Sequence, residues 1–228
     1  DGWRVQNLAH NVFYQFDCDP PLVKLKQIQS ELSSQVTREP RYERFESAGG
    51  VDLSYENYWL GVGAYVEMSV GSETLIRTEI AKSDLKFPYI PTYLAYREMP
   101  VLLHLLETVR ERAKLADVVL VDGTGILHPR HAGIASQLGI LMDVSTIGVT
   151  KKMLYGSVAV RGMETGEVRS VIDPEDGKPL GAAIKTSARA APIYVSVGHA
   201  IDLESAIELV LKLAKHKLPE PIHRAHLL

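Results

Sequence analysis

The chain has a single cysteine, Cys18, which excludes an internal disulfide and a cysteine-rich zinc site. A lone thiol fits a reducing compartment, so we expect a cytoplasmic protein. No apolar run approaches the roughly 18–20 residues of a membrane span, and the first residues do not read as a secretory signal. Neither sign of charge is in large excess, because the net charge is only −3. A nucleic-acid partner would therefore be held by a local patch and not by a global basic field.

The composition supports one sizeable core. The chain has 228 residues, of which 46% are hydrophobic, and it shows neither internal repeats nor a low-complexity linker. We therefore predict a single domain over residues 1–228. Runs of valine and isoleucine alternate with longer helical patterns, which is typical of α/β proteins.

The order of the predicted elements narrows the fold class further. A first helix is predicted from Asp19 as N-cap and Pro20 in the first turn, with apolar residues recurring to Val36. The next predicted elements are strands at 50–54, 58–68 and 74–79, a helix beginning near Pro100, a strand at 118–121, a helix at 131–138 and a strand at 144–149. A hairpin of 156–160 with 167–172 and extended segments at 182–187 and 192–197 follow. A last helix begins at Asp202, with Leu203, Ile207, Val210, Leu211 and Ala214 inward, and a short tail comes after it. This order predicts a ribonuclease-H-like fold: a central mixed sheet of three antiparallel strands and then parallel strands, flanked by helices.

The most informative stretch is the strand at 118–121 and the residues that follow it. Asp122 ends this apolar strand, and Gly123 and Gly125 come next. A carboxylate at the end of a buried strand loses hydration unless a cation or hydrogen-bond donors meet it, and glycines let a ligand or another backbone approach closely. The competing interpretation is that Asp122 caps the following turn.

Three further residues are candidates for the same site. Asp52 lies in the first predicted strand, and the predicted fold brings that strand beside Asp122. Two carboxylates in one site repel each other unless a cation joins them, and Mg²⁺ prefers oxygen ligands. Glu98 precedes the helix expected near Pro100, although an acid there also suits the helix dipole. Lys151 follows a strand and could hold a phosphate, or it could be a solvated lysine.

Taken together, these segments resemble the endonuclease V family from about residue 22 to residue 228, with residues 1 to about 20 outside the resemblance. The segments that carry it are Gly50-Val51-Asp52-Leu53-Ser54, Pro88-Tyr89-Ile90-Pro91, Tyr93-Leu94-Ala95-Tyr96-Arg97-Glu98, Val121-Asp122-Gly123 with Gly125 and His128-Pro129-Arg130, Gly133-Ile134-Ala135-Ser136, Thr146-Ile147-Gly148-Val149 with Lys151, and Val197-Gly198-His199. The resemblance implies a metal-dependent endonuclease for DNA repair. It would recognise deoxyinosine in single- or double-stranded DNA and cut the second phosphodiester bond on its 3′ side, leaving 3′-hydroxyl and 5′-phosphate ends.

The resemblance also implies roles for individual residues. Asp52, Glu98 and Asp122 would bind Mg²⁺, with Mn²⁺ as a substitute, and Lys151 would assist at the scissile phosphate. Tyr89 would be a wedge that fills the place of a displaced base. The remaining substrate-binding positions would be Pro88, Ile90, Pro91, Gly123, Gly133 and Leu154. The physics agrees, because two prolines stiffen the wedge loop, an aromatic ring can stack where a base has left, and a weakly paired base is easier to extract.

The histidines divide into two kinds. His226 stands where the family has an Asp or His that takes part in the metal site, and an imidazole can bind a cation directly or through water. We expect structural roles for His128 and His199, with a phosphate contact by His128 as a further prediction. Two departures from the family pattern are Thr124 and Gln137, where histidine is frequent. They leave the carboxylate set intact and bear on substrate preference.

Three other functions compete with this one. A ribonuclease acting on inosine in RNA would use the same residues and would differ by a contact to the 2′-hydroxyl. A protein that binds altered bases without cutting them gains nothing from acids beside phosphates. A nucleotide-cofactor enzyme is suggested by Gly123-Thr124-Gly125, but His128 stands where the Gly-x-Gly-x-x-Gly fingerprint needs its third glycine. No strong apolar surface stripe calls for a dimer, so we expect a monomer.

Overall fold

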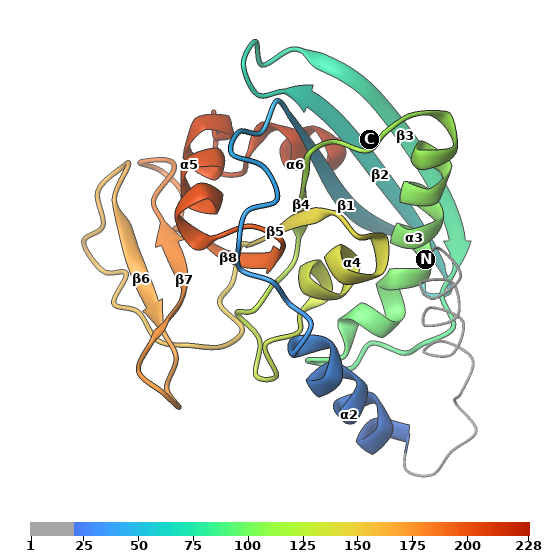
Figure 1. Cartoon of the computed structure of the whole chain (residues 1–228), viewed down its shortest axis with the longest axis horizontal. Coiled ribbons are helices and arrows are strands. Elements are labelled where there is room, and N and C mark those ends of the chain that lie inside the picture. Colours follow the sequence, from blue (N-terminus) through green and yellow to red (C-terminus); the bar gives the residue numbers. More distant parts are fainter. Residues whose placement is uncertain (1–20) are drawn as a thin grey trace.

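A computed structural model describes residues 21–228, and its centre is one eight-stranded sheet (Figure 1). The strands are β1 (Ser47–Asn57), β2 (Leu60–Ser69), β3 (Leu75–Asp84), β4 (Val118–Asp122), β5 (Ser145–Thr150), β6 (Val168–Ile172), β7 (Pro179–Ile184) and β8 (Ile193–His199). The helices are α2 (Pro21–Ser33), α3 (Leu94–Arg112), α4 (Ile134–Met142), α5 (Leu203–Leu213) and α6 (Glu220–Ala225). Cys18, Asp19 and Pro20, on which the sequence predictions for the first helix and the lone thiol rest, lie outside the described residues.

The sheet has the predicted ribonuclease-H-like arrangement. Its order is β3-β2-β1-β4-β5-β8-β7-β6. The first three strands form an antiparallel meander, β1 pairs in parallel with β4, and β4 pairs in parallel with β5. The strands β8, β7 and β6 continue the sheet in antiparallel fashion. The predicted neighbourhood of the first and fourth strands is therefore confirmed.

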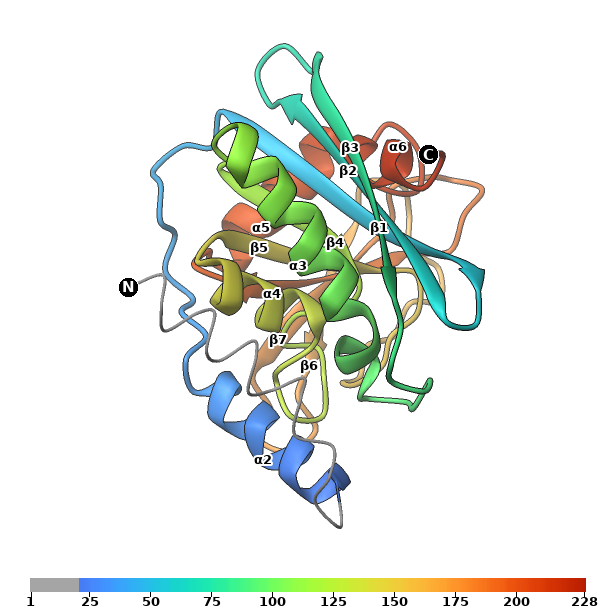
Figure 2. The ribbon, with the colours of Figure 1, turned by 90° about the vertical axis from the view of Figure 1, so that its right-hand side faces the viewer.

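Helices cover both faces of this sheet, and alternate residues of β4 pack on each side. Val119 and Val121 join the core beneath α3 and α4, whereas Val118 and Leu120 join the core on the side of α5 and α6. Figure 2 shows α3 and α4 in front of the central strands, with α6 behind them. Burial on both faces explains why the β4 sequence is a continuous apolar run. No helix of residues 21–228 is long and apolar enough to cross a membrane.

The C-terminal segment is not the short tail that the sequence suggested. It forms α6, which packs on β1 and β2. A side chain at Gly50 would place its Cβ only 2.2 Å from the carbonyl carbon of Pro221, so glycine lets the helix backbone lie directly on the strand. A six-residue helix with this contact is stabilised by packing and not by its own propensity.

Two other predictions were wrong. Residues 156–160 do not pair with 167–172 as a hairpin; β6 pairs with β7, and Ser157 makes only one bridge, to Ile172. Gly156 has φ +99°, a left-handed conformation that interrupts an extended strand. In α5, the side chain of Leu211 is exposed and not inward.

The beginning of α3 also differs from the prediction. The helix starts at Leu94, so Pro100 lies inside it and not in its first turn. A proline at this position has no N–H to donate to the carbonyl of Tyr96, and the surrounding core accepts the loss. Glu98 therefore lies within the second turn of the helix, where the side chain is buried.

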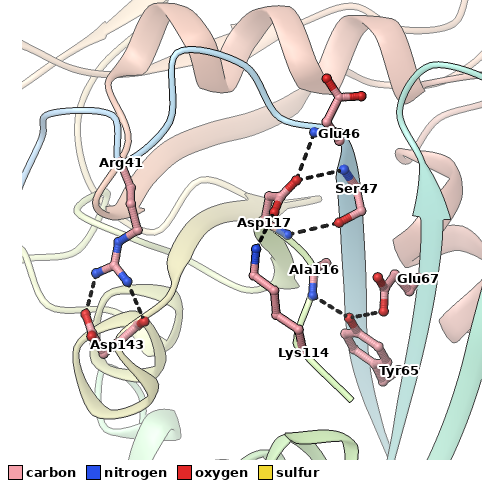
Figure 3. Close-up of polar contacts among 9 residues, drawn as sticks. All are labelled: Arg41, Glu46, Ser47, Tyr65, Glu67, Lys114, Ala116, Asp117 and Asp143. Atoms are coloured by element: carbon pink, nitrogen blue, oxygen red, sulfur yellow. Dashed lines mark hydrogen bonds and ion pairs between the residues drawn. The ribbon is translucent and has the colours of Figure 1, made fainter.

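Where β1 and β4 begin, both side-chain oxygens of Asp117 have partners (Figure 3). Asp117 Oδ2 accepts hydrogen bonds from the backbone N–H groups of Glu46 at 2.9 Å and Ser47 at 3.1 Å, and Lys114 Nζ lies 3.1 Å from Oδ1. Burial alone would raise the pKa of Asp117, but these donors lower it below its ordinary value. This carboxylate therefore has a structural role in joining the two strands.

Candidate active site

The two aspartates predicted from the sequence lie on neighbouring strands: Asp122 ends β4, and Asp52 lies in the middle of β1. Val51 pairs with Val121 in the parallel ladder, so Asp52 and Asp122 each follow that pair on neighbouring strands, which lie about 4.8 Å apart. Glu98 reaches the same place from α3, since it lies close enough to both aspartates for their charges to raise its pKa. The structure thus brings together all three acids predicted from the sequence.

Asp52 meets the C-terminal segment. Its Oδ2 lies 2.6 Å from Nδ1 of His226, the residue that follows α6. By the alternation of β1, Asp52 shares a face with Gly50, on which α6 packs. The side chain of Asp52 is 13% exposed and that of His226 is 55% exposed, so the imidazole borders on solvent. The close contact at Gly50 therefore positions His226 beside the acids.

Asp122 meets the lysine predicted to act with it. Lys151 Nζ donates to Asp122 Oδ2 at 3.0 Å. Burial raises the pKa of Asp122 above its ordinary value, the Lys151 charge opposes this, and the charge of Asp52 adds to it. The carboxylate that precedes β4, Asp117, has a lowered pKa, and the one that ends β4, Asp122, has a raised pKa.

The pKa of Glu98 is strongly raised. Burial raises the pKa of Glu98 to about 7; a hydrogen bond from the Tyr55 hydroxyl opposes the shift, and the charges of Asp122 and Asp52 add to it. Tyr55 itself, on β1, was not predicted from the sequence. Perturbed acids of this kind gather at functional sites.

A cavity of about 340 Å³, which we call the loop cavity, is lined by the chain neighbours of Asp122 and Lys151. It is lined by Gln29, Tyr89, Pro91, Thr92, Leu94, Ala95, Gly123, Thr124, His128, Ala132, Gly133, Ile134, Thr150, Lys152, Met153 and Leu154. Six of the predicted substrate-binding residues are among them. The other two are placed differently: Pro88 is exposed, and Ile90 packs against the small core of Leu25, Phe87 and Tyr96. The volume lies in the range of small-molecule sites.

The loop that carries Tyr89 is held in place by hydrogen bonds to the backbone of Thr92. Thr92 has a left-handed backbone with φ +68°, and its carbonyl oxygen accepts hydrogen bonds from Gln29 at 3.1 Å and from Arg130 at 2.7 Å. His128 Nε2 lies 2.9 Å from the same oxygen, and its Nδ1 accepts from the Arg130 N–H at 3.1 Å. Tyr89 is therefore held on a fixed loop with 61% of its surface exposed.

This bracing decides the role of His128. Both ring nitrogens are engaged, so the imidazole is a neutral donor to Thr92. Burial, together with the positive charge of Arg130, lowers the pKa of His128 to about 4. A structural role is the one that this geometry supports. His199 is likewise buried, and its Nδ1 accepts from the Thr37 N–H at 3.4 Å.

Known proteins share both the sequence and the fold. The Endonuclease V family profile matches residues 30–227. An endonuclease V of Methanothrix thermoacetophila is 39% identical over 222 residues, which cover 97% of this chain and 95% of the relative. The chain belongs to the endonuclease V family. Membership in endonuclease V makes it an endonuclease, a deoxyribonuclease by class.

Solved structures of endonuclease V agree with this assignment. The catalytic domain of human endonuclease V superposes with a TM-score of 0.85 at 30% identity, covering 92% of this chain and 94% of that one. An endonuclease V of Ciona intestinalis, in complex with a 24mer DNA containing an inosine followed by a ribo-adenosine, gives a TM-score of 0.82 at 28% identity, covering 91% and 95%.

Endonuclease V is in general a metal-dependent nuclease, and the three acids are the candidate metal ligands of this chain. Within residues 21–228, no three His, Cys, Asp or Glu side chains are grouped closely enough to hold an ion. Each acid has a protein partner instead: His226 for Asp52, Lys151 for Asp122 and Tyr55 for Glu98. The donor chemistry nevertheless fits a hard cation, because it consists of oxygen ligands whose mutual repulsion a cation would relieve.

The two departures from the family pattern lie near the loop cavity. Thr124 lines it. Gln137 is buried in α4 and donates to the Ala132 carbonyl at 2.9 Å, which holds a cavity-lining residue in place. Neither contacts the three acids in the way His226 or Lys151 does, so both departures concern the cavity wall.

Proposed function

We propose that this chain is a Mg²⁺-dependent endonuclease that recognises deoxyinosine in DNA and hydrolyses the second phosphodiester bond on its 3′ side. The products would carry a 3′-hydroxyl and a 5′-phosphate, and Mn²⁺ would substitute for Mg²⁺. One observation carries the proposal: Glu98 and Asp122, two acids with raised pKa values, lie with Asp52 beside a cavity of about 340 Å³ that is lined by an exposed aromatic residue and by the glycine that follows Asp122. A phosphate at the acids and a base in the cavity could belong to the same strand.

The proposed roles follow from the placement of each side chain. Asp52, Glu98, Asp122 and His226 would hold the metal, which supplies Lewis-acid stabilisation of the oxygens at the reacting phosphorus. Lys151 Nζ has two further hydrogens besides the one that Asp122 accepts. The ammonium can therefore contact a phosphate oxygen and stabilise the charge that develops there.

The loop cavity would hold the displaced base. Gly123 and Gly133 line it without side chains, so backbone groups can approach the base edge. Tyr89 would stack in the place that the base leaves, and Leu154, which is 44% exposed, also lines the cavity. Action as a monomer in the cytoplasm, by residues 1–228 as a single domain, stays a prediction.

Incision of a labelled DNA strand with one deoxyinosine tests the proposal. With Mg²⁺ we expect a cut one nucleotide beyond the lesion, and with EDTA no cut. Asp122→Asn should reduce incision by about 10²-fold or more, whereas the matched variant Asp117→Asn, at the other end of β4, should cut at the wild-type rate. Equal rates for the two variants would contradict the proposed roles, and tight binding without incision would favour the non-cleaving binder.

Inosine-containing RNA is the second candidate substrate. The observation that favours it is that a Ciona intestinalis endonuclease V has been solved with DNA in which a ribo-adenosine follows the inosine. An RNA strand of matched sequence, assayed beside the DNA, separates the two. A cut only on the RNA would assign the enzyme to RNA metabolism with the same site residues.

A further inference from the structure

A second hollow, which we call the aromatic cleft, lies beside Glu98 and has a volume of about 540 Å³. It is lined by Tyr55, Asn57, Tyr58, Tyr89, Leu94, Arg97 and Glu98. These residues come from the β1–β2 hairpin, the loop before α3 and the first turns of α3, which lie next to one another in Figure 2. None of the roles described above uses the hairpin residues Tyr58 and Trp59.

The aromatic rings of this cleft are exposed but fixed. The Arg97 guanidinium is buried and lies over two rings, 5.0 Å from the centre of Tyr55 and 4.5 Å from that of Tyr58. It also donates to the backbone carbonyls of Tyr58 and Phe87. Trp59 packs edge-on against Tyr58, with ring centres 4.6 Å apart. A rigid aromatic surface loses little conformational freedom when a ligand stacks on it.

Burial in the core does not explain these rings. Tyr58 is 52% exposed and Trp59 is 55% exposed, in the turn that joins β1 to β2. Arg97 holds the hairpin by donating to the carbonyl of Tyr58. The outer faces of the Tyr58 and Trp59 rings take no part in that hydrogen bond. The outer faces are therefore available to a flat, apolar partner.

The position of the acids indicates what that partner is. The loop cavity is lined by Gly123, which directly follows Asp122, and the aromatic cleft is lined by Glu98. Tyr89 lines both hollows, so they are neighbours with the acids alongside. A strand with the deoxyinosine base in the loop cavity and the second phosphate on its 3′ side at the acids continues past Glu98 into the cleft.

We infer that the aromatic cleft binds the base of the nucleotide on the 3′ side of the scissile bond, by stacking on Tyr58, against which Trp59 packs edge-on. This inference rests on the proposed function. Every base has an aromatic face, so the contact tolerates any sequence. It makes the hairpin a positioning element, which holds the leaving strand while the acids and Lys151 act on the phosphate.

The test pairs a change in the protein with a change in the DNA. One deoxyinosine substrate is intact, and a second lacks only the base 3′ to the cut. The dissociation constant and the incision rate are measured for wild type, Tyr58→Ala and Tyr58→Phe. Loss of one stacked base weakens binding by about 5- to 150-fold, so we expect that loss for wild type on the abasic DNA and for Tyr58→Ala on intact DNA.

Three outcomes decide the inference. If it holds, Tyr58→Ala does not discriminate between the two substrates, and Tyr58→Phe, which keeps the ring, behaves as wild type. If base removal weakens wild type and Tyr58→Ala equally, the base lies elsewhere and the inference fails alone. If wild type cuts neither substrate, the proposed function fails and the inference fails with it.

Discussion

Replacing Glu98 by glutamine is predicted to stabilise the metal-free protein while abolishing incision. Burial and the neighbouring aspartates raise the pKa of Glu98 from 4.5 to about 7. The folded state therefore favours the protonated acid, and ionisation of this side chain opposes folding. A glutamine resembles the protonated acid and can still accept the hydrogen bond from Tyr55.

The magnitude follows from the two pKa values. Below pH 4.5 the acid is protonated in both the folded and the unfolded chain, and it costs nothing. Between pH 4.5 and 7 the folded chain binds more protons, so the free energy of unfolding falls as the pH rises. Above pH 7 the full cost is reached, about 3 kcal/mol for the shift to about 7. The side chain is only 8% exposed, so solvent screens little of this cost.

Urea unfolding in EDTA at pH 5 and pH 8 measures the effect. Between these values the free energy of unfolding of wild type should fall by about 2 kcal/mol more than that of Glu98→Gln. Added Mg²⁺ should stabilise wild type more than the variant at pH 8. The same pH dependence in both proteins would refute the reasoning.

The control is Asp117→Asn, because the pKa of Asp117 is shifted in the opposite direction. The stability that Asp117 contributes is present above its unfolded pKa of 3.8 and is lost only as the pH falls below it. Both assay pH values lie above 3.8, so this variant should be destabilised by a similar amount at each. A gain in stability at pH 8 would argue against a structural role for Asp117.

Two further predictions concern packing around the site. Gly50→Ala should lower the free energy of unfolding by about 1–3 kcal/mol and reduce incision, which the melting temperature and the incision rate measure. The control Gly71→Ala, whose Cβ would meet nothing closer than 4.0 Å, should change neither quantity. An unchanged melting temperature for Gly50→Ala would show that α6 moves away freely. The buried Asp173 carboxylate lies 3.1 Å from the Tyr155 hydroxyl and 3.0 Å from His131 Nε2. Asp173→Asn should therefore lower the free energy of unfolding in urea by about 1–3 kcal/mol. A loss below about 0.5 kcal/mol would contradict that pairing.

The central sheet could be predicted because its signals are local. The apolar run ending at Asp122 and the glycine-flanked strand around Asp52 are each legible in a short window, and the order of elements then brings them together. The helix α6 could not be predicted in this way. It has six residues and includes Pro221, so it shows no helical period, and the reason for it lies at Gly50, far away in the sequence.

The site was predicted less completely than the sheet. The three acids, Lys151 and His226 were named from the sequence and from the family resemblance, but their partners were not. Tyr55 looks like an ordinary strand residue until α3 places Glu98 against it. The sequence pattern predicts Glu98 before the helix, because proline is typical of a first turn, whereas the helix already begins at Leu94. Gln29, which braces the loop of Tyr89, gives no signal because its partner Thr92 is distant in the chain.

The pairing of Asp52 with His226 joins residues 174 positions apart. A nascent chain that has already made every strand of the sheet still lacks α6, and its first strand is uncovered at Gly50. A segment made after every strand of the sheet therefore places the imidazole beside the acids. Synthesis that stops early yields a polypeptide with the sheet of a nuclease but without the imidazole beside its acids.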